Sequence, residues 1–305
     1  MKLKILYKGI FYTSIASIFW GIPQPIFFNQ LKFVPTLEVV SHRSIWSFII
    51  LFFTLTFIGK INEFFNIFQN KKKIFYLSIT GFLILINWTG FILAIDLNRL
   101  QDASMGYYIS PIVSIILGYF FLNEKISKLK IISISLMITS IIFLVLSVKT
   151  FPFLALLIAL SWSFYGLLRK KISVSSEIGL LFESGFISFF AIFYVTYLHF
   201  IGQSHFLGSG LQVSVLLFFT GVITVLPLFF FNSGIKFVPL GLAGVIFYLT
   251  PTFHFMTSII IFKEELNIYK LVTFIIIWIA VIIFIYDNIN IKEKKINGNN
   301  TQLLN

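Results

Sequence analysis

Long, uninterrupted apolar segments are the feature that most constrains the fold of this chain. A helix needs about 20 apolar residues to cross the roughly 30 Å hydrocarbon core of a bilayer. Ten segments approach that length, at residues 10–30, 37–58, 74–95, 103–122, 131–148, 153–168, 178–198, 213–231, 242–262 and 271–286. They are continuous rather than alternating, which favours helices over the strands of a membrane barrel. The sequence therefore predicts an all-α membrane protein with ten transmembrane helices.

The composition fits a bilayer environment and excludes several kinds of site. Only 11% of the residues are charged, whereas soluble domains average about 25%. The chain has no cysteine, so a disulfide, a thiolate nucleophile and a cysteine zinc site are impossible. It also lacks a phosphate-binding loop, an HExxH metal motif and a GxSxG nucleophile elbow. We therefore expect no enzyme activity, no metal and no cofactor.

The basic residues are sorted by side, which predicts the orientation. With ten spans both termini lie on the same side, and loops rich in Lys and Arg face the cytoplasm. Seventeen of the 23 Lys and Arg residues fall on the side of the termini, five fall on the other side, and Arg43 lies within a span. This predicts a multi-pass inner-membrane protein with cytoplasmic termini, whose first apolar segment is a retained span and not a signal peptide. The net charge of +12 then reflects the membrane, and we expect no nucleic-acid partner.

An internal repeat divides the chain into two halves. Tyr108, Pro111, Glu124 and Lys130 recur at one constant offset, 140 in the numbering, as Tyr248, Pro251, Glu264 and Lys270. Five spans is an odd number, so the second copy must be inverted, as in many secondary transporters, whose substrate sites lie where the repeats meet. We expect five-helix repeats at 1–148 and 149–287, followed by a polar, disordered cytoplasmic tail at 288–305.

Ionisable side chains within the spans are the first candidates for a functional site, because their burial in a bilayer is costly. Glu38, His42 and Arg43 lie in the second predicted span, Glu183 in the seventh and His254 in the ninth. Arg43 and Glu183 are separated by the repeat offset, so the repeat relates a cation to an anion. These groups bind a polar or zwitterionic substrate, or couple transport to protons. The alternative is structural: Glu38 and Arg43 reach the outer headgroups, Glu183 is a satisfied structural carboxylate, and His254 is a buried neutral side chain.

Amphipathic side chains and prolines inside the spans are further candidates. Aromatic and amide side chains that line a cavity would suit organic substrates, although packing is the alternative for each. The group comprises Trp20, Asn87, Trp88, Tyr107, Tyr108, Trp162, Tyr165 and Tyr248. Pro111 and Pro251 are expected hinge or gate elements, because proline removes a backbone donor and bends a helix. Glu124 and Glu264 are expected to cap the turns that follow their spans.

Eight motifs in order resemble the EamA branch of the drug/metabolite transporter superfamily, along almost the whole chain. They are FWGIPQPIFF (19–28), EVVSHRSIWSF (38–48), NWTGFILA (87–94), DASMGYYISPIVSIILG (102–118), SFYGLLRKKI (163–172), GVITVLPL (221–228), FYLTPTF (247–253) and KLVTFIIIWIAVIIFIYD (270–287). Asp102 stands where related sequences often carry Glu, and Ser110 where they often carry Asn, which puts an amide contact there in doubt.

The resemblance implies two inverted five-helix repeats, cytoplasmic termini, and export or exchange of small metabolites through a central pocket. Carried over by position, the substrate-binding candidates are Trp20, His42, Arg43, Trp46, Asn87, Trp88, Tyr108, Tyr165, Glu183 and Tyr248. We expect a secondary active transporter of small organic metabolites or drugs that works by alternating access. Arg43 would hold an anionic group and Glu183 a cationic group or a proton, with a proton or a counter-substrate as the alternatives for coupling. A membrane-embedded enzyme and a non-transporting membrane receptor are the competing interpretations.

Overall fold

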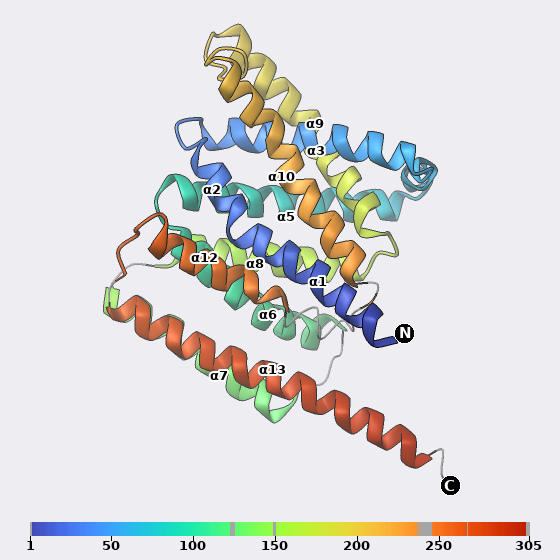
Figure 1. Cartoon of the computed structure of the whole chain (residues 1–305), viewed down its shortest axis with the longest axis vertical. Coiled ribbons are helices and arrows are strands. Elements are labelled where there is room, and N and C mark those ends of the chain that lie inside the picture. Colours follow the sequence, from blue (N-terminus) through green and yellow to red (C-terminus); the bar gives the residue numbers. More distant parts are fainter. Residues whose placement is uncertain are drawn as a thin grey trace.

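A computed structural model describes residues 2–122, 126–148, 151–235, 237, 246–266 and 268–302, and these residues form helices and no strand. The helices are α1 (Lys2–Gly21), α2 (Pro23–Asn29), α3 (Thr36–Phe57), α4 (Ile61–Phe65), η1 (Asn66–Gln69), α5 (Lys71–Asp96), α6 (Leu100–Leu122), α7 (Lys128–Val148), α8 (Phe153–Lys170), α9 (Ser176–Phe200), α10 (Leu211–Ile235), α12 (Leu249–Ile260) and α13 (Ile268–Gln302). Figure 1 shows them stacked as a bundle of long helices. The all-α prediction is confirmed for the described residues.

Seven of the described helices are long and apolar enough to cross a membrane. They are α3, α5, α6, α7, α9, α10 and α13. The apolar part of α8 is shorter. The helix α12 has 12 residues and begins after a turn at Tyr248, so it covers only the later part of the predicted span 242–262. These helices make the chain a multi-pass membrane protein.

Local sequence explains where several helices end. Gly59 and Gly202 follow α3 and α9 with φ values of +71° and +69°. After Gly59, the N–H of Lys60 donates to the carbonyl of Leu55, and the N–H of Gly59 donates to that of Thr56. This left-handed closure suits glycine, which carries no Cβ. The first predicted span, 10–30, is divided into α1 and α2 at Ile22, because Pro23 favours the first turn of a new helix.

Helices from the two halves of the sequence are interleaved. α6 packs against α8 and α12, α3 against α9 and α10, and α1 against α10 and α12. α7 and α13 lie side by side at one edge of the bundle (Figure 1). Only 22% and 28% of their apolar windows are buried, against 50–56% for α3, α5, α6 and α9. The central helices therefore form the core, and α7 and α13 offer most of their surface to lipid.

Two carboxylates fix connecting segments at the ends of the helices. The buried carboxylate of Glu38 accepts the backbone N–H of His205 at 2.7 Å and lies 2.8 Å from the Nδ1 of the same residue. It therefore holds the loop between α9 and α10. The expectation that Glu38 extends to the headgroups does not fit this buried position. Glu264 accepts the N–H groups of Leu100 and Gln101 at 2.6 and 3.0 Å. It caps α6 in the other half and not the turn that follows it, and its counterpart Glu124 lies outside the described residues.

Two other predictions concern helix continuity. Pro111 lies inside the continuous helix α6, whereas Pro251 lies in the first turn of α12, after a turn at Tyr248. A proline in the first turn removes a donor that has no intrahelical acceptor, so Pro251 fits the start of α12. The helix α6 continues through Pro111, and the hinge role of both prolines stays a prediction. The helix α13 continues to Gln302, past the start of the expected disordered tail. Residues 288–302 contain no Pro and a single Gly, at position 298, so no proline interrupts the helix there.

Candidate functional site

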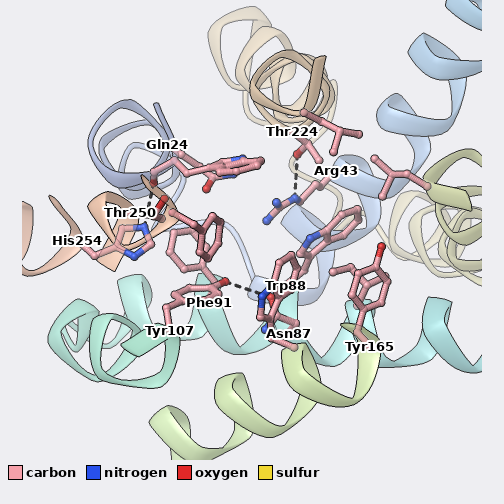
Figure 2. A pocket seen from close by; sticks show the side chains of 16 residues that line it. Gln24, Arg43, Asn87, Trp88, Phe91, Tyr107, Tyr165, Thr224, Thr250 and His254 are labelled. Carbon is pink, nitrogen blue, oxygen red and sulfur yellow. Dashed lines mark hydrogen bonds between the residues drawn. The ribbon is translucent and has the colours of Figure 1, made fainter. Parts of the chain in front are cut away.

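A cavity of about 110 Å³ lies at the centre of the bundle, where helices of both halves meet. Figure 2 shows its side chains converging from several helices on one space. It is lined by Trp20, Gln24, Arg43, Ile84, Asn87, Trp88, Phe91, Tyr107, Trp162, Tyr165, Leu180, Thr224, Leu228, Phe247, Thr250 and His254. A mostly apolar and aromatic cavity with a few convergent polar groups is the usual form of a small-molecule site.

Arg43 on α3 is the charged side chain that lines this cavity, and only 5% of it is exposed. Its Nε donates to the hydroxyl of Thr224 at 2.9 Å. Its guanidinium carbon lies 4.3 Å from the ring centre of Trp88 and 5.1 Å from that of Phe28. Its Nη1 has no hydrogen-bond partner among the described residues. Figure 2 shows the guanidinium pointing into the cavity, so part of its donor capacity is available there.

Asn87 connects three helices behind the aromatic wall. Its Nδ2 donates to the carbonyl of Ile158 and to the hydroxyl of Ser161, each at 3.2 Å. Its Oδ1 accepts the hydroxyl of Tyr107 at 3.1 Å. A buried amide needs partners, and these bonds join α5 to α8 and α6. Asn87 therefore orients Tyr107 at the cavity wall.

The opposite wall depends on the break between α1 and α2. Pro25 has no N–H to give to the carbonyl of Gly21, and the hydroxyl of Thr257 donates to that carbonyl instead, at 3.1 Å. The Nε2 of His254 donates to the carbonyl of Trp20 at 2.9 Å. The side chains of α12 thus satisfy backbone groups that the break leaves without helical partners.

The structure places five of the ten predicted binding residues on the cavity: Trp20, Arg43, Asn87, Trp88 and Tyr165. The other five, His42, Trp46, Tyr108, Glu183 and Tyr248, lie outside its lining. The rings of His42 and Trp46 pack on Phe206 with centroids 4.8 and 6.1 Å apart. At about 100° per residue, His42 and Trp46 lie roughly 100° and 60° around α3 from Arg43, so they face Phe206 in the loop after α9 and not the cavity.

Tyr108 and Tyr248 pack on each other, with ring centroids 6.2 Å apart and ring planes 19° apart. The hydroxyl of Tyr108 lies 2.6 Å from that of Thr252. These repeat-related side chains occupy the contact between α6 and α12, away from the cavity. The role of Tyr108 and Tyr248 in substrate binding stays a prediction.

Glu183 lies behind the cavity wall and is fully buried. It accepts the hydroxyl of Thr80 at 2.7 Å and that of Tyr165 at 3.1 Å. The Nε of Arg169 lies 3.8 Å from its Oε1. Arg43 and Glu183 therefore have separate partners, and Tyr165 stands between the carboxylate and the cavity.

Helical spacing could have found several lining residues that we did not predict. Ile84, Asn87, Trp88 and Phe91 have the i, i+3, i+4, i+7 spacing of one helix face, so the prediction of Asn87 implied Ile84 and Phe91. Thr224 and Leu228, and Trp20 and Gln24, are likewise four positions apart. Tyr107, Trp162 and His254 were noted in the sequence without being assigned to the site. Leu180, Phe247 and Thr250 gave no distinct signal.

No metal site accompanies the cavity within the described part of the chain, where no group of three or more His, Asp or Glu side chains could hold an ion. The polar groups around the cavity are one guanidinium, one imidazole, amides, hydroxyls and indole N–H groups. They suit hydrogen bonding to an organic molecule.

Comparisons with known proteins concern the family and the fold of the chain. The model of the EamA-like transporter family matches twice, at residues 7–146 and 150–286. The uncharacterized transporter YojE of Bacillus subtilis is 33% identical over 292 residues, which are 94% of this chain and 96% of YojE. The protein RarD of Escherichia coli is 32% identical over 294 residues, 96% of this chain and 99% of RarD. A crystal structure with 13% sequence identity has a TM-score of 0.57 and covers 90% of this chain and 96% of its own, which shows a shared fold.

The two matches of the family model cover nearly the whole chain, and the similarity to YojE and RarD extends over almost its full length. The chain therefore belongs to the EamA-like transporter family and, within it, resembles the RarD proteins.

Proposed function

We propose that this protein is a secondary active transporter that moves small organic metabolites across the inner membrane through the central cavity. The observation that carries the proposal is the cavity itself, which is lined by residues of α1, α2, α3, α5 and α6 of the first half and of α8, α9, α10 and α12 of the second. A substrate held there contacts both halves at once. Movement of one half against the other would expose it to either side in turn.

The helix contacts support two inverted repeats. When each helix of the first half is exchanged with its repeat counterpart in the second, the contact of α6 with α8 becomes that of α12 with α1. The contact of α3 with α10 likewise becomes that of α9 with α5, and both partners of each exchange are present. The pairs α3 with α9, α6 with α12 and α7 with α13 map onto themselves. This is the pattern expected of a twofold axis relating five helices to five.

A pair of close approaches at glycines supports the same axis. A Cβ on Gly81 would lie 3.0 Å from the ring of Phe186, and a Cβ on Gly221 would lie 2.6 Å from the Cβ of Trp46. The repeat offset relates position 81 to position 221 and position 46 to position 186. The two half-matches of the family model, at 7–146 and 150–286, also support a duplication.

A helix lies within each of the ten predicted spans, and this supports the ten-span count. With ten spans, the excess of Lys and Arg on the side of the termini favours both ends in the cytoplasm. We therefore propose this orientation in the inner membrane.

Of the two roles predicted for Glu183, the geometry favours proton binding. Its carboxylate lies beside Arg169 and behind Tyr165, so a cationic group in the cavity would not contact it directly. A proton could reach it through the hydroxyl of Tyr165. Coupling to a counter-substrate stays the alternative.

A pair of substitutions on one helix tests the transport path. Leu228 lines the cavity, whereas Leu226, two positions earlier on α10, is 39% exposed on the outside of the bundle. Leu228→Trp would fill the cavity, and Leu226→Trp adds the same ring where lipid accommodates it. Proteoliposomes with the purified full chain are incubated with a small-molecule extract of cells, and mass spectrometry measures the vesicle contents.

The wild type and Leu226→Trp should accumulate the same compounds, and Leu228→Trp should accumulate none above empty vesicles. Equal accumulation by Leu228→Trp would show that the cavity is not the path. No accumulation by the folded wild type would favour an enzyme or a receptor.

A further inference from the structure

The charges around the cavity restrict the class of cargo. Its lining residues include Arg43 and, within the described chain, no Asp, Glu or Lys. The buried carboxylate behind its wall, that of Glu183, already has Arg169 at 3.8 Å. The cavity therefore carries a cation without a matching anion, whereas the anion outside it has its own counter-charge.

Arg43 keeps its charge in an environment where an unpaired charge is costly. Its Nε bonds Thr224, and Trp88 covers the guanidinium at 4.3 Å. These contacts orient the group but do not neutralise it. A buried guanidinium with an unpartnered Nη1 gains most from a carboxylate, which it binds through charge-assisted hydrogen bonds, frequently two at once.

The remaining lining of the cavity restricts the size and polarity of the rest of the cargo. Rings of Trp20, Trp88, Phe91, Trp162 and Phe247 surround a volume of about 110 Å³. That volume is of the same order as the roughly 150 Å³ cavity that binds benzene in an engineered protein. Because no carboxylate lines the described cavity, the ammonium of an amine or a zwitterion would have no counter-charge there, and Arg43 would repel it.

We infer, on the basis of the proposed transport function, that the cargo is an organic monoanion whose carboxylate pairs with Arg43 and whose planar apolar body, of about one ring, lies among the aromatic side chains. Arg43 keeps its predicted role of holding an anionic group, whereas a cationic group of the cargo at Glu183, one of the two predicted alternatives, is not part of this inference. Gln24 and Thr250, which also line the cavity, provide polar groups for a substituent on the body.

Ligand binding to the purified full chain in detergent tests the inference. Three of the five tryptophans, Trp20, Trp88 and Trp162, line the cavity, so intrinsic fluorescence reports its occupation. The probes are benzoate, benzyl alcohol and benzylammonium, which share a ring and differ in charge. We expect benzoate to bind at least about tenfold more tightly than either of the others, because hydrogen bonds between charged groups are the stronger ones.

The arginines of the chain provide the variants. Arg43→Gln should weaken benzoate binding by about tenfold to a hundredfold and bring it to the level of benzyl alcohol. Arg43→Lys, which keeps the charge but not the planar fork, should weaken it less. Arg99, whose side chain is 43% exposed beside Asp102, is the matched control, and Arg99→Gln should bind benzoate as the wild type does.

Benzylammonium binding as tightly as benzoate would overturn the inference, and so would an Arg43→Gln variant that keeps the wild-type preference for benzoate. Absence of benzoate binding up to about 10 mM, ten times the upper end of usual KM values, would also overturn it. The outcome is separate from that of the transport test. Flux of amines or neutral compounds through the cavity would support the proposed transport function and contradict an anionic cargo. Selective benzoate binding without any flux would contradict the proposed transport function and support an anion-binding site at Arg43.

Discussion

Arg43 and Glu183 occupy equivalent places in the two halves and differ in one respect. Both lie on the helices α3 and α9, which cross each other, and each bonds a threonine of the neighbouring helix, Thr224 on α10 and Thr80 on α5. Glu183 has a second charge beside it, Arg169, whereas Arg43 forms no ion pair within the described chain.

The difference indicates that the repeat conserves a position for a buried charge but not its use. In the second half the charge is neutralised inside the protein and joins α9 to α8. In the first half it is left for a group that enters the cavity. The comparison predicts a division of roles. Glu183 is needed for the folded structure besides the proton binding proposed for it, and Arg43 is needed for the ligand.

Removal of Glu183 should have the largest effect on stability. Glu183→Ala leaves Arg169, whose side chain is 12% exposed, without its counter-charge, and breaking a buried pair costs about 3–5 kcal/mol. We expect this loss in the free energy of unfolding, measured by denaturant titration in detergent. The double variant Glu183→Leu with Arg169→Met should recover much of it. Wild-type stability of Glu183→Ala would end the comparison, because Glu183 would then be no more structural than Arg43.

The second-largest effect on stability is expected at Gly221, and its repeat counterpart Gly81 should respond less to the same substitution. A Cβ at position 221 would meet backbone atoms of Trp46 and Ser47 at 2.7 and 2.9 Å. One at position 81 would meet the ring edge of Phe186 at 3.0 Å and the backbone of Glu183 at an ordinary contact distance of 3.6 Å. We expect Gly221→Ala to cost about 1–3 kcal/mol, as overpacking does. Gly81→Ala should cost less than half as much, since a ring can shift. Equal losses in the two thermal unfolding curves would contradict this asymmetry.

Replacement of Arg43 should leave stability nearly unchanged. Arg43→Leu removes an unpaired buried charge, and this gain offsets the lost contacts with Trp88 and Thr224, so the free energy of unfolding should stay within about 1 kcal/mol. Thr224 keeps a partner because its hydroxyl also donates to the carbonyl of Thr220 at 2.8 Å. Flux in proteoliposomes should nevertheless be lost. A strongly destabilised Arg43→Leu protein would assign Arg43 a structural role like that of Glu183.

Replacement of Glu264, a carboxylate at the boundary of the bundle, should have the smallest effect on the free energy of unfolding. Burial raises the pKa of Glu264 above its ordinary value of 4.5, and the backbone N–H groups of Gln101 and Leu100 oppose this only in part. The folded state then holds this proton more tightly than the unfolded state, so the contribution of Glu264 to stability is present below its ordinary pKa and is lost as the pH rises through the raised pKa. Glu264→Gln should remove this part of the pH dependence, seen in unfolding midpoints recorded across that range. A steeper pH dependence of the unfolding midpoint in Glu264→Gln would contradict the raised pKa of Glu264.

Helix positions followed from the sequence because a bilayer demands long apolar segments, and each predicted span contains a helix. The division of the first span into α1 and α2 was less accessible. Pro23 and Pro25 indicate a bend, but the new helix depends on donors from Thr257 and His254 of α12, which belong to the other half of the sequence.

The site was predicted only where a residue stood out from its apolar surroundings. Arg43, Asn87 and Trp88 did so, whereas Thr224 did not, because a hydroxyl inside a helix commonly bonds its own preceding turn. Glu183 stood out equally but faces away from the cavity. Its partner Arg169 was counted among the cytoplasmic loop charges, and a long side chain near a helix end can reach back into the bundle. Which buried charge meets the cavity is decided by tertiary contacts that hydropathy does not record.

The absence of cysteine allows a direct test of whether the cavity is the transport path. Single cysteines at Leu228, on the cavity, and at Leu226, on the outer surface of α10, are treated with a membrane-impermeant thiol reagent while reconstituted vesicles transport their substrate. Modification of Leu228→Cys should abolish flux, and should proceed faster during turnover than at rest, while Leu226→Cys keeps its flux. Full flux through a quantitatively modified Leu228→Cys protein would contradict the account.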